Sequence, residues 1–167
     1  MKQGTLGDCY LLATLVAFDA RPGALERLWY TDKINSAGIY AMKFRIAGEE
    51  RLVYVDDNLP VRYGNLTFAH SSVKGELWQA LAEKIWAKLV GSYSAAEAGN
   101  AQWVLKYITN DPVQGFNPRN MNSSQRLGLW NDMKRWSEKE YLVFAGTDPS
   151  TNPNLWVGRH AYTVLSA

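Results

Sequence analysis

Cys9 has the surroundings that a nucleophilic thiol requires. It is the single cysteine of the 167-residue chain, so it takes part in no internal disulfide. It opens an apolar run that predicts a helix, and the unpaired N–H groups at a helix start favour the thiolate over the thiol. We expect Asp8 to cap that helix, and Gly4 and Gly7 to let the chain turn tightly ahead of it. Gln3 can then supply a side-chain N–H to an oxyanion hole that it shares with the Cys9 backbone N–H.

A base for this thiol has to come from one of two histidines, His70 and His160. His160 opens an alternating, β-rich segment, so we expect it at the entry of a strand, on the same face as Tyr162 and Val164. A base on a rigid strand, far in sequence from a helix-borne cysteine, is the general cysteine–histidine arrangement. His70 lies in a polar turn before a helix, where a structural or solvent-facing role is expected. The plain alternative is that Cys9 is a small buried hydrophobic residue.

Several stretches of the chain resemble the protease core of the calpain family, in the family's order and at similar spacing. They cover residues 3–15, 38–44, 54–60, 76–93 and 160–165, with Phe-Ala-His-Ser between the third and the fourth. The resemblance implies an α+β, papain-like fold, in which a helical first lobe with a central Cys-bearing helix faces a β-rich second lobe that is incomplete here. It also implies a Cys–His–Asn triad that cleaves peptide bonds. Cys9 matches the nucleophile, His160 the base and Gln3 the oxyanion donor.

The resemblance leaves two parts of the family's machinery unmatched. The triad asparagine of calpains follows the histidine in an Asn-Pro-Trp motif, whereas Asn152 and Asn154 precede His160 and do not match it. We therefore expect that asparagine outside a sequence that is clipped at both ends of the core. Of the family's calcium ligands, Glu76 alone is matched, and one carboxylate does not make a site for an ion that takes about six to eight oxygens. No cofactor is expected to be required within this chain, and calcium follows from the resemblance only.

The composition sets broad limits on partners and location. A net charge of +2 is too small to indicate nucleic acid or a membrane surface as a partner. No apolar run reaches the roughly 18 residues of a membrane span. A single free cysteine without a signal peptide fits the reducing cytosol, so a cytoplasmic location is expected. The expected partners are protein or peptide substrates, and the oligomeric state stays open.

The periodicity of apolar residues predicts a helical first unit over residues 1–112 and a second unit over 113–167 that carries the histidine. A Pro-, Asn- and Ser-rich stretch at 111–125 is interpreted as the hinge between them. Helices are predicted at 9–18, 76–90, 102–108 and 127–136, a hairpin at 39–46 and 51–55, and strands at 141–146 and from His160 onward.

The leading hypothesis is a cysteine endopeptidase of calpain type. A rival from another class is a catalytically incomplete calpain-like domain that serves interaction or regulation. The unmatched asparagine favours this rival, whereas the intact set of Gln3, Cys9 and His160 disfavours it. A third reading is another acyl transfer, such as transamidation, on a similar cysteine–histidine scaffold.

Overall fold

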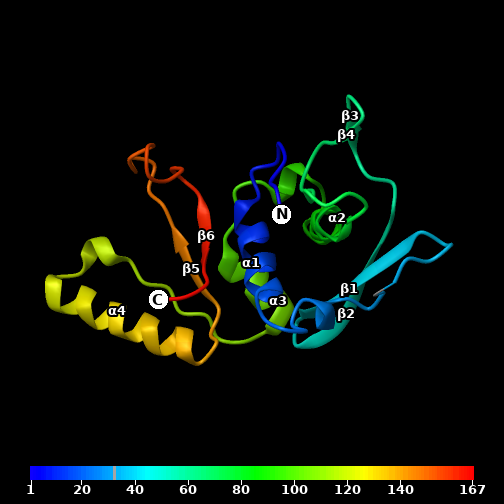
Figure 1. Cartoon of the computed structure of the whole chain (residues 1–167). Coiled ribbons are helices and arrows are strands. Elements are labelled where there is room, and N and C mark those ends of the chain that lie inside the picture. Colours follow the sequence, from blue (N-terminus) through cyan, green and yellow to red (C-terminus); the bar gives the residue numbers. More distant parts are fainter. Residues whose placement is uncertain (32) are drawn as a thin grey trace.

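Helix α1 (Cys9–Asp19) is the centre of the molecule. The computed structural model describes residues 1–31 and 33–167. Figure 1 shows α1 between the C-terminal hairpin and α4 on one side and α2 with the other hairpins on the opposite side. Both sides of the helix are covered because its sequence is apolar nearly all round. Its buried side chains are Tyr10, Leu11, Leu12, Ala13, Thr14, Leu15, Ala17 and Phe18.

Helices and strands mix along the chain, which confirms the predicted α+β class. The α-helices that follow α1 are α2 (Trp78–Val90), α3 (Ala101–Thr109) and α4 (Ser123–Glu138). Short 3-10 turns lie at η1 (Glu26–Leu28), η2 (Ser94–Ala96) and η3 (Pro118–Asn120). The strands are β1 (Ile39–Ile46), β2 (Glu49–Asp56), β3 (Val61–Arg62), β4 (Asn65–Leu66), β5 (Val143–Gly146) and β6 (Ala161–Val164). Each strand pairs with its neighbour in a two-stranded antiparallel sheet, in the order β1-β2, β3-β4 and β5-β6.

The predicted first hairpin is confirmed. Strands β1 and β2 pair in register from Ile39 opposite Asp56 to Ile46 opposite Glu49. Ala47 and Gly48 both adopt positive φ at the turn, as a tight hairpin that follows the twist of its strands requires.

The largest side chain of the core is Trp86 of α2, which is 2% exposed. Its ring lies 6.3 Å from that of Tyr10 in an edge-on arrangement and 6.4 Å from that of Phe44 on β1. Its Nε1 donates to the Tyr10 hydroxyl at 2.9 Å, and that hydroxyl donates to the Ala96 carbonyl at 2.8 Å. Trp86 thus joins α1, α2 and β1 with its polar atom satisfied.

Helix α4 begins earlier than the sequence predicted. Asn122 accepts a hydrogen bond from the Gln125 backbone N–H at 3.0 Å, and the Gln125 side chain accepts one from the Asn122 N–H at 2.9 Å. This reciprocal capping box starts the helix at Ser123, inside the stretch interpreted as a hinge. The prediction placed the start of the helix too late because Asn and Ser favour helix starts as well as turns.

The second predicted unit, 113–167, consists of α4 and the β5–β6 hairpin as its main elements. The hairpin runs alongside α1 in Figure 1, whereas α4 lies at the edge of the molecule and has no buried residue. The division of the chain at residue 112 stays a prediction. In the described residues, none of the helices combines the length and the apolar character that crossing a bilayer would take.

Candidate active site

Cys9 is the first residue of α1 and is half-buried. The Asp8 carbonyl accepts hydrogen bonds from the backbone N–H groups of Leu11 at 2.8 Å and Leu12 at 3.3 Å, so the helix is fully formed from the cysteine onward. The first N–H groups of a helix have no partner within it. The thiol therefore lies at the positive end of α1, as the sequence predicted.

Asp8 does not cap this helix, and that prediction is wrong. Its side chain makes no capping hydrogen bond and is completely buried, because it points towards α2, where Glu83 is also buried. When Asp8 is ionised, neither of its oxygens finds a donor among the described residues. The neighbouring ionisable side chain is Glu83, and a hydrogen bond between two carboxyl groups needs a proton on one of them. Burial raises the pKa of Asp8 to about 6, and burial together with the Asp8 charge raises the pKa of Glu83 to about 9.

Glu83 is a residue of the site that sequence reasoning missed. Its carboxylate also accepts the backbone N–H of Ala69, at 3.0 Å for the nearer oxygen. A signal was present, because Glu83 is four residues after Gln79 and three before Trp86, and both of those are buried on the same helix. An acidic residue on the buried side of a helix predicts a partner, but the sequence does not say that the partner is Asp8.

Gln3 is held in place by a short strand-like pairing. Lys2 and His70 exchange two backbone hydrogen bonds, of 2.7 and 3.0 Å, and the Thr5 N–H donates to the Thr67 carbonyl at 3.1 Å. The Gln3 side chain donates through Nε2 to the Leu6 carbonyl at 2.7 Å, which leaves one amide hydrogen for another acceptor. Residues 67–70 are in turn tied to α2 through Ala69, so α2 positions Gln3 indirectly.

Close packing, and not the backbone conformation of a turn, explains why residue 4 is glycine. It does not have the positive φ that favours glycine, but a Cβ at this position would lie 2.4 Å from the backbone of Phe68. The two segments can approach closely only without a side chain there. Gly7 shows neither feature, since its φ is not positive and no atom lies within 4 Å of a Cβ built on it.

His160 lies immediately before β6 and is fixed through its backbone. Its N–H donates to the Thr147 hydroxyl at 3.0 Å, and its carbonyl accepts the Thr147 N–H at 2.9 Å. Its ring packs edge-on against Tyr162, with 4.8 Å between ring centres. In the part of the chain that the structure describes, no hydrogen bond to the imidazole nitrogens is found. Packing on Tyr162 is the interaction found for the ring.

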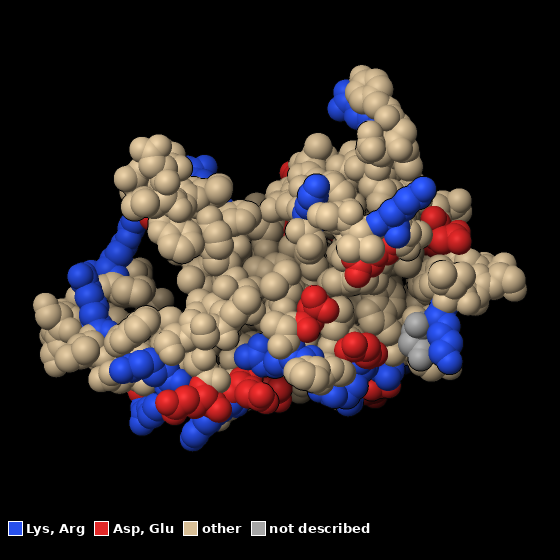
Figure 2. Space-filling view, in the orientation of Figure 1, with Lys and Arg blue, Asp and Glu red and all other residues tan. Residues whose placement is uncertain are grey.

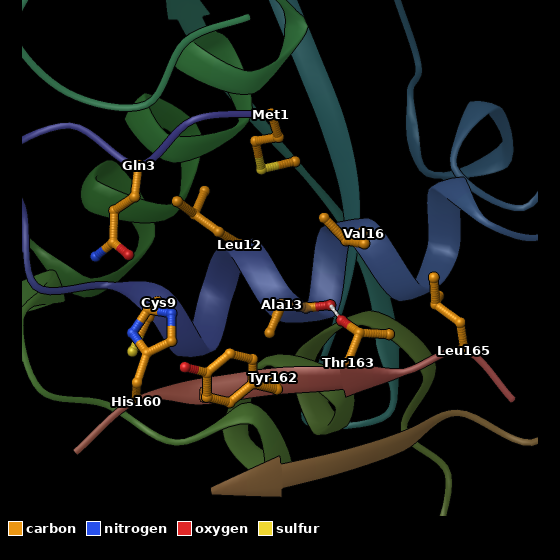
Figure 3. A pocket seen from close by; sticks show the side chains of 11 residues that line it. Met1, Gln3, Cys9, Leu12, Ala13, Val16, His160, Tyr162, Thr163 and Leu165 are labelled. Carbon is orange, nitrogen blue, oxygen red and sulfur yellow. Dashed lines mark hydrogen bonds between the residues drawn. The ribbon is translucent and has the colours of Figure 1, made fainter. Parts of the chain in front are cut away.

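Gln3, Cys9 and His160 line one pocket of about 290 Å³ between α1 and β6. Figure 3 shows them at the same end of this pocket, where the His160 ring and the Gln3 amide both point towards Cys9. The structure thus brings together one residue from the N-terminal segment, one from α1 and one from the entry to β6. Their catalytic roles stay predictions. His70 is not among the lining residues, and its Nδ1 lies 2.9 Å from the Phe68 carbonyl oxygen, in agreement with the structural role expected for it.

The rest of the pocket wall is uncharged. It consists of Met1, Leu12, Ala13, Val16, Ala161, Tyr162, Thr163 and Leu165. Figure 2 shows the same uncharged character over the surface between the N-terminal segment and β6. Such a wall suits uncharged and apolar groups better than charged ones.

The surroundings of Glu76 bear on calcium, the ion that the family resemblance implied. No group of three or more His, Cys, Asp or Glu side chains among them could hold a metal ion. The carboxylate of Glu76, the one ligand that the resemblance implied, already accepts hydrogen bonds from the Ser71 hydroxyl, from Trp78 Nε1 at 3.1 Å and from Gln79 Nε2 at 3.1 Å. These donors lower the pKa of Glu76 and occupy the oxygens that would bind a cation.

Comparison with known proteins decides the family. Residues 1–167 match the model of the calpain family cysteine proteases. The chain belongs to the calpain family. It is 33% identical over 171 residues to the calpain-type cysteine protease DEK1 of Zea mays, and 33% identical over 172 residues to the calpain-2 catalytic subunit of Gallus gallus. It is also 34% identical over 169 residues to calpain-9 of Mus musculus.

These alignments cover nearly all of this calpain-family chain but a minor part of each relative. They include 98%, 99% and 97% of this chain, against 8%, 24% and 24% of the three relatives. The chain therefore spans a quarter or less of the length of these relatives.

Proposed function

We propose that this chain carries the nucleophile, the base and one oxyanion donor of a calpain-type cysteine endopeptidase that cleaves protein substrates. One observation carries the proposal: His160, about 150 residues further along the chain, lines a single pocket together with Gln3 and Cys9. Chance burial of a lone cysteine does not account for a histidine and a glutamine amide that point to it. The cysteine protease names of the family and of its relatives support the same chemistry.

The steps follow from the positions of these three groups. The Cys9 thiol gives its proton to a ring nitrogen of His160, and Sγ attacks the carbonyl carbon of the scissile peptide bond. The resulting oxyanion accepts hydrogen bonds from the Cys9 N–H and from the Gln3 amide hydrogen that Leu6 does not use. The histidinium then protonates the amine as the C–N bond breaks. A water molecule, deprotonated by His160, finally hydrolyses the thioester and releases the free cysteine.

A second candidate, a calpain-like interaction or regulatory domain without peptidase activity, has one observation in its favour. The described residues offer no hydrogen bond to the His160 ring, and a base is fully effective only when a third group orients it. Under this alternative, Cys9 would acylate no faster than an ordinary accessible thiol.

An activated ester separates the two candidates. Nitrophenolate needs no proton to leave, so a peptide p-nitrophenyl ester tests attack by Cys9 without general acid catalysis. We expect a burst of about one nitrophenolate per chain, as an accumulating acyl-enzyme gives, and a mass increase confined to the Cys9 peptide. Cys9→Ser should abolish the burst, and His160→Ala should slow it by about a hundredfold or more.

His70→Ala is the matched control, because it removes the other histidine side chain and leaves the backbone pairing with Lys2 available. It should keep the wild-type burst. Equal rates for His160→Ala and His70→Ala, or a label on residues other than Cys9, would refute the proposed function in favour of the regulatory domain.

A further inference from the structure

Arg21 joins α1 to the start of the β5–β6 hairpin. This half-buried residue follows the end of α1, and its guanidinium donates three hydrogen bonds to backbone carbonyls. One goes back to Ala17 at 2.7 Å, within the helix. The other two cross to the segment ahead of β5, through Nε to Glu140 at 2.7 Å and through a terminal nitrogen to Tyr141 at 2.6 Å.

A second link lies closer to the pocket. The Thr163 hydroxyl on β6 donates to the Ala13 carbonyl on α1 at 2.5 Å. Figure 3 shows this bond between the two elements, with Cys9 and His160 on one side of it and Val16 and Leu165 on the other. The hairpin is thus bonded to α1 in the middle of the helix and again beyond its C-terminal end.

These two links fix a register. A strand advances by about 3.3 Å per residue, so a slip of the hairpin by one residue along α1 would carry His160 several ångströms away from Cys9. Displacements of about 1 Å already cost roughly a hundredfold in rate in enzymes. The apolar contacts between β6 and α1 cannot exclude such a slip by themselves, because they have no direction.

We propose that Arg21 and Thr163 are positioning residues, which set the register of the β5–β6 hairpin along α1 and so align His160 with Cys9. This inference rests on the proposed function, since it assumes that His160 acts on Cys9. The planar fork of the arginine is essential to it, because two of its N–H directions reach successive carbonyls. A lysine at the same position keeps the charge but not the fixed geometry.

The test measures the rate of Cys9 carboxymethylation by iodoacetamide in the full chain, across about pH 5 to 8, where histidine titrates. Because Cys9 is the single cysteine, all incorporated label reports on it. We expect the wild-type rate to change with pH over this range and His160→Ala to lose that dependence. Arg21→Gln should lose the same part of the pH profile and slow labelling by about tenfold to a hundredfold. Arg21→Lys should recover only part of the loss.

A double variant distinguishes positioning from general weakening. Arg21→Gln should have no further effect on labelling when His160 is already alanine, because both substitutions remove the same contribution, the action of His160 on Cys9. Arg45→Gln, which removes an exposed arginine on β1, is the control and should match the wild type. Thr163→Val replaces only the hydroxyl and serves if Arg21→Gln fails to fold, as judged by circular dichroism.

Each outcome has one meaning. A wild-type pH profile in folded Arg21→Gln, or in Thr163→Val, overturns the inference and leaves the proposed function intact. An additive loss in the double variant also overturns it. If His160→Ala itself labels like the wild type, the proposed function fails instead, and the inference fails with it.

Discussion

Asp8 and Glu83 form a buried acidic pair next to the nucleophile, and this pair makes stability depend on pH. Both folded-state pKa values lie above the ordinary ones of 3.8 and 4.5, at about 6 and about 9. The folded state therefore binds more protons than the unfolded state over this range. The contribution of the pair to folding stability is complete at pH values below the unfolded-state pKa values. It is lost as the pH rises through the folded-state pKa values.

We predict that the free energy of unfolding falls between about pH 5 and about pH 8, with a slope of up to roughly 1.4 kcal/mol per pH unit for each group. Urea unfolding at the two pH values measures it. Glu83→Gln should flatten the dependence, because a neutral amide can donate to ionised Asp8 and still accept from Ala69. The exposed Glu49→Gln is the control. Stability that rises with pH in the wild type contradicts the assignment.

Gly4 and Gly7 give a matched pair of substitutions next to Gln3. Gly4→Ala places a Cβ 2.4 Å from the Phe68 backbone, so one of the two segments must move. We expect a loss of about 1–3 kcal/mol in stability. We also expect slower acylation of Cys9, because Gln3 shifts with the segment.

Gly7→Ala should be close to neutral, because the space around a Cβ there is open. Thermal unfolding and the nitrophenolate burst measure both variants. Equal effects of the two substitutions would show that chain flexibility, not the approach to Phe68, is what glycine supplies.

At the scale of elements, the capping box decides where α4 begins. Asn122→Ala removes one of its two reciprocal bonds and should cost about 1 kcal/mol. We expect the first turn of α4 to fray, which hydrogen exchange of the amides after residue 122 detects. Asn131→Ala, in the middle of the same helix and exposed, is the control and should leave exchange unchanged or slower.

The labelling rate of Cys9 should stay at the wild-type value in Asn122→Ala, because the capping box is at the opposite end of α4 from Glu140 and Tyr141, which Arg21 bonds. A strong decrease would show that α4 takes part in positioning His160, in conflict with the role given to Arg21 and Thr163.

At the scale of the whole molecule, the elements differ in how deeply they are buried. Nearly all of α1 is in the core, whereas α4 has no buried residue. Local opening is favoured where few apolar contacts are lost. We therefore predict that native-state hydrogen exchange is slowest in α1 and fastest, among the α-helices, in α4. Uniform protection of both helices would contradict this prediction.

The sequence by itself determined the family, the mixed fold and the positions of most elements. The apolar run after Cys9 predicted a buried helix and the alternation at 39–46 predicted a strand, and both are confirmed because these signals are local. The motif around Cys9 and the segment after His160 carried the resemblance to calpains, which the family match confirms. The early start of α4 was missed because turn and cap residues are the same types.

The tertiary structure alone decided which distant residues meet. The sequence predicted that Asp8 caps α1, whereas in the folded protein its side chain is buried beside Glu83. Nothing in the sequence near Arg21 indicates a distant partner, but folding brings the carbonyls of Glu140 and Tyr141 within its reach. The convergence of Gln3, Cys9 and His160 on one pocket also depends on packing between segments far apart in the chain. Periodicity describes how each segment folds, whereas the partner of a buried charge or of a guanidinium is set by the three-dimensional arrangement of those segments.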